Sequence, residues 1–288
     1  MSRAAIGAVL VFAACTAQAQ WTFDVGAERM YDDNLPRAQS AADIVSDSLT
    51  RFSLAAARPL YVDGRTSLAF GAESRIVLYD RYHGLSHTAL GGSLSLRHKL
   101  GLGLAAPWLE GRIGAVREGY REPLRDGDRF GAQLGGGWRL SEAFQVSAGG
   151  RYDRFISRNN LPSAPGYDGT SFDAQGRSLH ARAALDATER LQLSLGLAAR
   201  KGDVVSSSRR NFAIFRASNA ISPDPVFGPD YFTYRLSGAT TRSATLGASW
   251  AIDERSSLSA SVATDRTSAR GGIQYDSTVV GLHYLYRH

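Results

Sequence analysis

The chain has 288 residues, of which 43% are hydrophobic, 10% aromatic and 21% charged, with 30 Gly, 9 Pro and one Cys. This composition excludes a disordered chain and a collagen-like repeat, and the single cysteine excludes a disulfide scaffold or a cysteine-based metal site. Lys and Arg outnumber Asp and Glu by 33 to 27, a net charge of +6. Because these charges alternate with apolar residues and form no patch, nucleic acid is not an expected partner.

The first residues predict export. Arg3 precedes an apolar run from Ala4 to Ala14, and an Ala-x-Ala cleavage site ends at Ala19. We therefore expect residues 1–19 to be a signal peptide and residues 20–288 to be the mature domain. Cys15 leaves a second interpretation, in which Cys15 becomes the acylated first residue of a lipoprotein, although Phe12 stands where Leu is usual.

Apolar residues recur at every second position in twelve segments spread along the mature chain. In the segment 191–197, for example, four leucines alternate with Gln192, Ser194 and Gly196. Such alternation predicts β-strands with one apolar and one polar face. The segments begin near Trp21, Phe52, Leu68, Leu90, Leu109, Phe130, Phe144, Leu179, Leu191, Leu246, Leu258 and Val280. The stretch 234–252 is long for a single membrane strand, and we expect one strand that extends beyond the bilayer.

The connections between these segments fall into two classes. Tight turns at residues 63–64, 141–142, 188–190 and 253–255 alternate with long links at 31–48, 118–127, 154–176 and 202–231. Short turns at one end and long loops at the other are typical of an outer-membrane barrel, whereas a soluble sandwich has no reason to sort its loops.

Aromatic residues on the apolar faces gather next to the short turns, as in the girdles of membrane barrels. They are Trp21, Trp138, Phe144, Trp250, Tyr284 and Tyr286. The mature chain thus resembles small, porin-like bacterial outer-membrane β-barrels. The ending Tyr284–His288 resembles the aromatic signal read by the barrel-assembly machinery, with His288 in place of Phe. The element Asp32–Leu35 resembles a stretch of several barrels, among them surface-lipoprotein assembly modifiers.

This resemblance implies an all-β fold: a closed antiparallel up-and-down transmembrane barrel of about twelve strands, with long extracellular loops and short periplasmic turns. It also implies the outer membrane of a Gram-negative bacterium as the location. Outer-membrane lipid and, during biogenesis, the barrel-assembly machinery are the expected partners.

Some barrels of this size are enzymes, so catalytic residues must be considered. Ser86 and His87 are the most suggestive pair, but neighbours on a strand point to opposite faces and cannot easily bond each other. Asp32 and Asp33 lack the matching Asp/His pair of a surface protease and are read as an acidic loop. No His/Glu cluster has metal-ligand spacing. We predict no catalytic site, no metal site and no cofactor.

The inward-facing positions are rich in arginine. Eleven basic residues oppose seven acidic ones there, and five arginines are predicted to line a pore from mid-height upward: Arg75, Arg112, Arg129, Arg151 and Arg182. Arginine rings select anions, which predicts a passive small-solute channel with anion preference. The alternative from the same residues is a salt-bridged interior that fills a narrow barrel. A non-channel barrel for surface assembly, adhesion or export is the runner-up function, and a lipid-modifying enzyme is the third.

Overall fold

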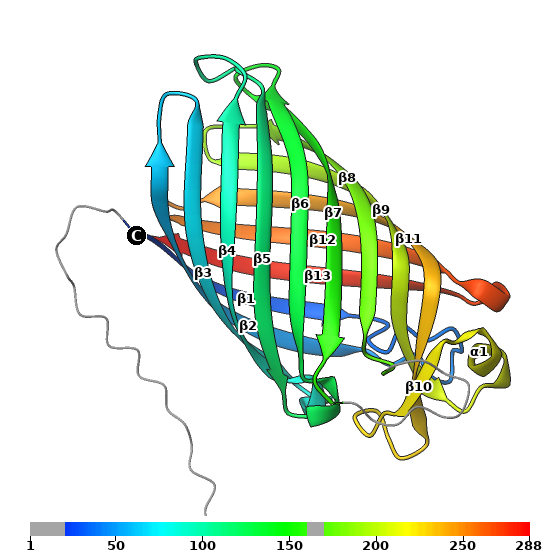
Figure 1. Cartoon of the computed structure of the whole chain (residues 1–288). Helices are drawn as coiled ribbons and strands as arrows, with labels where there is room; N and C mark the ends of the chain where they lie inside the picture. The colour runs from blue at the N-terminus through cyan, green and yellow to red at the C-terminus, as the bar shows by residue number, and fades with distance from the viewer. Residues whose placement is uncertain (1–20, 160–169) are drawn as a thin grey trace, which may run out of the picture.

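The computed structural model describes residues 21–159 and 170–288, in which twelve antiparallel strands close into a barrel (Figure 1). The predicted barrel fold is thereby confirmed. The predicted signal peptide, with Cys15, lies outside the described residues. The barrel strands are β1 (Thr22–Asp32), β2 (Asp47–Val62), β3 (Thr66–Tyr79), β4 (His87–Lys99), β5 (Trp108–Tyr120), β6 (Gly127–Arg139), β7 (Phe144–Ser157), β8 (Ala174–Asp186), β9 (Leu191–Arg209), β11 (Tyr231–Ala251), β12 (Ser256–Ser268) and β13 (Gln274–Arg287).

Each barrel strand pairs with its neighbours in chain order, and two pairings close the ring. β9 pairs with β11, and β13 pairs with β1. Reciprocal backbone hydrogen bonds between Phe23 and His288, with N···O distances of 2.8 and 3.2 Å, fasten the second pairing at one end. Closure leaves the barrel without a free sheet edge.

The alternating sequence pattern becomes two faces of the barrel wall. Leu195 lies opposite Leu246 on the outer face, while Ser194 lies opposite Gly247 on the inner face. Leu195 is 45% exposed and Leu246 is 63% exposed. Such an outward apolar belt is the surface that lipid covers in a transmembrane barrel.

The two ends of the barrel differ in their connections. At one end, here called the short-turn end, the turns at 63–65, 140–143, 187–190 and 252–255 contain three or four residues. The Asp253 carboxylate holds its turn by accepting hydrogen bonds from the backbone N–H groups of Arg255 and Ser256, each at 2.8 Å. One connection departs from the expected pattern: residues 100–107 form an eight-residue turn with exposed Leu100, Leu102 and Leu104.

At the opposite end, here called the long-loop end, β9 and β11 continue beyond the ring as a two-stranded ribbon. Arg209 pairs with Tyr231, so β9 runs further than the long link expected to begin at Gly202. The expected single long strand at 234–252 is present as β11. Its register shifts between Leu236 and Ala239, where Gly238 has φ +71°, a conformation that glycine adopts without strain.

The ribbon carries a small folded unit, residues 203–238, here called the cap. It holds the helix α1 (Phe212–Ala217) and the short strand β10 (Ala220–Pro223), which pairs with β11 outside the ring (Figure 1). Ile214, Tyr234 and Leu236 pack there with Ile273 of the β12–β13 loop as a buried apolar cluster. In the part of the chain that the structure describes, no helix is long and apolar enough to cross a bilayer.

Candidate functional site

The lumen of the barrel holds a polar cavity of about 540 Å³ along strands β3 to β7. Four predicted pore-lining residues, Arg75, Arg112, Arg129 and Arg151, line this cavity. Arg182 lines a second cavity of about 320 Å³, whose walls come from β8, β9, β11 and β12. The structure therefore places four of the arginines together and the fifth further round the ring.

The walls of these two cavities differ in chemistry. The wall along β3 to β7 carries the arginines together with Glu73, Glu118, His87 and Tyr120. Apart from Arg182 and Gln192, the second wall is built from small and hydroxyl-bearing residues, among them Ser194, Thr245, Ser249, Ser259 and Ser261. Charge in this part of the lumen is thus concentrated on one side.

Arg129 is neutralised by Glu118, a carboxylate that the sequence analysis assigns to the link 118–127. Its Nε donates to Glu118 Oε1 at 2.9 Å, and the Tyr120 hydroxyl donates to Glu118 Oε2 at 2.9 Å. Glu118 is buried, and the Arg129 guanidinium also stacks over the ring of Phe155. Glu118 continues the inward parity of Glu110 and Arg112 on β5, so extending the alternation further along the chain would have found it.

Other lumen arginines also have acidic partners. Arg75 lies 3.7 Å from Glu73 on the same strand. Arg51 pairs with Glu28 at 2.6 Å, and Arg200 pairs with Asp153 at 3.2 Å. These pairs fix side chains against the wall and cancel part of the positive charge that the sequence predicts for the lumen.

Arg112, Arg151 and Arg182 have no ion pair with any described residue. Among the described residues, Arg112 Nη2 donates to the neutral Ser93 hydroxyl alone, at 3.0 Å. Arg112 and Arg151 lie directly opposite Gln133 on its two sides, in one row across β5, β6 and β7. Two strand spacings separate them, about 10 Å. All three arginines are exposed, so their positive charge faces the accessible space of the lumen.

Above this cavity, loops rooted on distant strands meet across the long-loop mouth. Asp224, in the loop between β10 and β11, is fully buried and accepts from Arg125 Nη2 at 2.6 Å, Ser207 Oγ at 2.6 Å and Thr233 Oγ1 at 2.8 Å. Arg125 belongs to the β5–β6 loop. This buried ion pair ties the cap to the arginine-rich side of the barrel.

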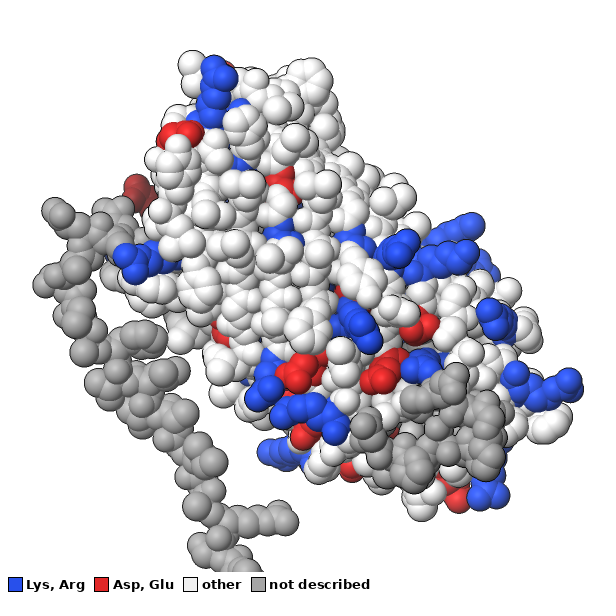
Figure 2. All heavy atoms as spheres, in the orientation of Figure 1, with Lys and Arg blue, Asp and Glu red and all other residues white. Residues whose placement is uncertain are grey.

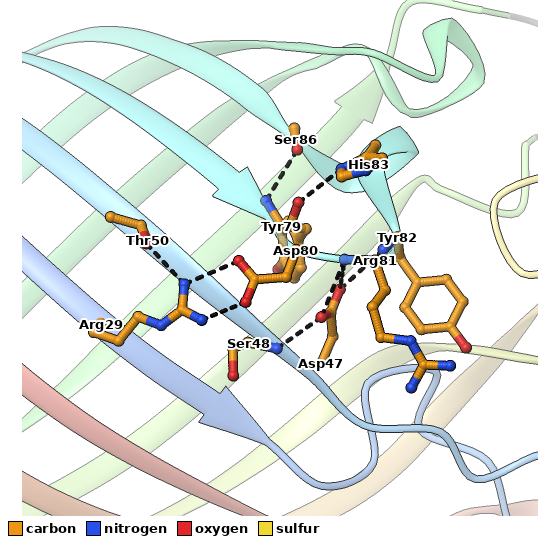
Figure 3. A network of polar contacts seen from close by, with 10 residues as sticks. All are labelled: Arg29, Asp47, Ser48, Thr50, Tyr79, Asp80, Arg81, Tyr82, His83 and Ser86. Atoms are coloured by element: carbon orange, nitrogen blue, oxygen red, sulfur yellow. Dashed lines mark hydrogen bonds and ion pairs between the residues drawn. The ribbon is translucent and has the colours of Figure 1, made fainter.

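A second contact crosses the full mouth. The ring of Phe227, near Asp224, lies 5.0 Å from the ring of Tyr82 in the β3–β4 loop, half way round the ring of described strands. Tyr82 is held in place by Asp47, whose carboxylate accepts from the backbone N–H groups of Arg81 and Tyr82, at 3.1 and 2.9 Å (Figure 3). The loop that carries Tyr82 is therefore held in place where Phe227 of the cap contacts it.

The loop after β1 reaches the cap as well. Asp32 holds Arg37 through two hydrogen bonds of 2.7 Å, and the carbonyls of Pro36 and Arg37 accept from Ser207 N and Ser206 Oγ, at 2.8 and 2.7 Å. Together with the Asp224 and Phe227 contacts, this loop narrows the long-loop mouth above the lumen.

The residues considered for catalysis have other partners. Ser86 Oγ accepts from Tyr79 N at 3.0 Å (Figure 3), and His87 Nδ1 lies 2.9 Å from the Leu85 carbonyl, with its ring against Tyr120. Asp32 is engaged by Arg37, and Asp33 accepts from Thr278 N at 2.7 Å. These four side chains hold loops and strand ends in place.

Comparison with known proteins agrees with this geometry. No family model and no curated protein matches the sequence. The solved COG4313 outer-membrane channel from Pseudomonas putida F1 superposes with a TM-score of 0.57 at 13% identity, covering 95% of this chain and 97% of that one. The fold is that of an outer-membrane β-barrel. The KdgM porin and the channel DcaP of Acinetobacter baumannii have TM-scores of 0.44 and 0.45, each at 11% identity, covering 91% and 96% of this chain and 98% and 100% of their own.

Proposed function

We propose that the chain is a passive channel for small anionic solutes in the outer membrane of a Gram-negative bacterium. Its short-turn end would lie in the periplasm and its long-loop end outside the cell. The observation that carries the proposal is the unneutralised pair Arg112 and Arg151, which flank Gln133 on the wall of the lumen cavity. The channel fold of the COG4313 protein supports the channel class alone.

The mechanism follows from charge and width. Uncompensated guanidinium groups on the wall of a narrow pore attract anions and repel cations, because the low-dielectric wall focuses their field into the lumen. Arg182, on the serine-bearing wall, adds positive potential further round the lumen. The loops that meet at Asp224 narrow the entrance and would restrict passage to small solutes. Arg129 forms an ion pair with Glu118, so it adds no net charge to the lumen. In this account the protein is not an enzyme.

The bridged mouth favours a second candidate function. Loops from β1–β2, β3–β4 and β5–β6 all contact the cap or its loop. If these contacts close the mouth, the barrel would serve surface assembly, adhesion or export without conducting solutes. Conductance separates the two candidates.

The test is the reversal potential of the purified protein in a planar bilayer under a KCl gradient. We expect anion preference in the wild type, stronger at low salt because the Debye length is about 30 Å at 0.01 M. Arg112→Gln/Arg151→Gln removes two charges but keeps polar side chains, so the potential should move toward cation preference. The matched control is Arg117→Gln/Arg154→Gln, which removes two outward cations from the same strands and should leave the potential unchanged.

Each other outcome has a defined meaning. A wild-type protein that folds but does not conduct would contradict the channel and favour the second candidate. Conductance with a reversal potential that Arg112→Gln/Arg151→Gln does not move would show that these residues do not set selectivity.

A further inference from the structure

A row of cations lies on the outer face of the barrel, where the apolar belt ends near the long-loop end. The residues occupy outward positions on neighbouring strands from β7 to β12, and each is exposed. Figure 2 shows Lys and Arg side chains gathered at the lower right of the barrel, toward the cap, beside a largely uncharged face. This outer cation row consists of Arg154, Arg177, Lys201, Arg242 and Arg266.

The members of the row face like charges. Arg177 lies directly opposite Lys201, and Arg242 lies directly opposite Arg266. Like charges that lie directly opposite each other on neighbouring strands repel and destabilise the sheet, whereas opposite charges in the same positions stabilise it. Of the row, Arg266 alone forms an ion pair with a described residue, Asp276 at 3.6 Å. Asp203, two residues after Lys201, accepts instead from the backbone N–H of Gln175 at 3.1 Å.

At the same height near the long-loop end, the described outward cations on β1 and β5 do have carboxylate partners. Arg29 is bound by both oxygens of Asp80 (Figure 3), and Arg117 pairs with Asp128 at 3.0 Å. Near the long-loop end, the outward strand cations that lack an ion pair with a described residue thus lie on one side of the barrel. An anion supplied from outside the protein would relieve their repulsion.

An apolar groove of about 570 Å³ lies on the same side, toward the short-turn end. Ala248 and Ala260 lie opposite each other and leave a hollow between larger residues such as Leu195, Leu246 and Val262. Leu246 and Val262 each stand four residues from a cation of the row, Arg242 and Arg266, a rise of about 13 Å along a strand. The cations toward the long-loop end and the apolar groove toward the short-turn end together fit one amphipathic molecule.

We propose that this face binds a phosphorylated, acylated lipid of the outer leaflet. Its phosphates would lie against the outer cation row, and one acyl chain would fill the groove. Guanidinium groups bind phosphate through charge-assisted hydrogen bonds, and basic residues at a membrane surface attract anionic headgroups. The inference rests on the proposed placement of the barrel in the outer membrane, with the long-loop end outside.

The test uses the folded full-length protein in neutral detergent, with lipid A carrying two phosphates as the probe and native mass spectrometry as the readout. The variant Arg177→Gln/Lys201→Gln/Arg242→Gln/Arg266→Gln should weaken binding at least about tenfold, because each basic residue contributes to headgroup attraction. The control Arg29→Gln/Arg117→Gln removes outward cations that already have partners and should bind as the wild type does. Heat-modifiable migration on gels verifies that every variant is folded.

Further arms identify the ligand. Lipid A stripped of both phosphates should bind at least about tenfold more weakly than the intact form, and millimolar inorganic phosphate should not displace intact lipid A. Ala248→Phe fills the groove on an outward, apolar face and should also reduce binding. Equal binding by the fourfold variant and the wild type would overturn the proposal, and displacement by inorganic phosphate would show a simple anion site instead of a lipid site.

The channel and the lipid site can fail separately. The fourfold variant leaves the lumen unchanged, so its KCl conductance should equal that of the wild type. Lipid A binding without conductance would contradict the channel alone, and conductance without lipid A binding would contradict the lipid site alone.

Discussion

The barrel and the cap place their large apolar side chains in opposite environments. In the barrel, large apolar residues such as Leu195 and Leu246 face outward and are exposed. In the cap, Ile214 and Leu236 are each 1% exposed and pack against Tyr234 and Ile273. The barrel therefore depends on closed strand pairing and on lipid around it, whereas the cap depends on its own small core and on the ion pair that ties it to the mouth. Different substitutions should break each one.

The largest effect is expected at the tie between the two regions. Asp224→Asn keeps the shape and the capacity to accept from Ser207 and Thr233 but leaves the mostly buried Arg125 without its counter-charge. Removing one partner of a buried ion pair costs about 3–5 kcal/mol. The cap should therefore loosen, so that trypsin cuts faster at Arg209, Arg210 or Arg216 and the KCl conductance rises.

The barrel should not respond to that change. Heat-modifiable migration of Asp224→Asn should match that of the wild type, because the ring of strands keeps all its pairings. Loss of the folded band together with the cap would contradict the separation between the two regions.

The next effect tests the outer face of the barrel. Leu195→Arg places a charge in the middle of the apolar belt and should lower the free energy of unfolding by about 2–4 kcal/mol. Its neighbour Ser194→Arg places the same charge on the inner face and should be far milder. Urea unfolding in lipid vesicles, followed by heat-modifiable migration, measures both. Equal losses would mean that the assigned register or the membrane-facing role of the outer face is wrong.

The smallest effect concerns a short turn and depends on pH. Hydrogen bonds from the backbone N–H of Arg255 and from Ser256 hold the pKa of Asp253 below its usual value. A carboxyl with a lowered pKa stabilises the fold above its unfolded-state pKa, about 3.9 for Asp, and this stabilisation is lost as the pH falls through the folded-state pKa. Asp253→Asn should therefore unfold at a slightly lower urea concentration than the wild type at pH 7, and the gap should close below about pH 4. A gap of equal size at both pH values would exclude the carboxylate charge as its cause.

The contrast between barrel and cap also explains what the sequence could predict. Alternation is local, so the faces of Leu195 and Ser194 and the inward parity of Arg112 can be read from neighbouring residues. Asp224 binds Arg125, which lies 99 positions earlier in the chain, and no periodic pattern encodes such a contact. Glu118 could be predicted from the sequence, since it continues the alternation of β5 into the stretch expected to be a link.

The measurement that tests the central claim most directly asks whether Arg112 faces water inside a conducting lumen. Arg112→Cys and its outward neighbour Ile113→Cys, each prepared as the mature chain, are placed in a planar bilayer and treated with an anionic, membrane-impermeant methanethiosulfonate. The account predicts that the current through Arg112→Cys falls and its reversal potential moves toward cation preference, while Ile113→Cys does not respond. A conducting Arg112→Cys protein that the reagent leaves unchanged, or an equal response from Ile113→Cys, would contradict it.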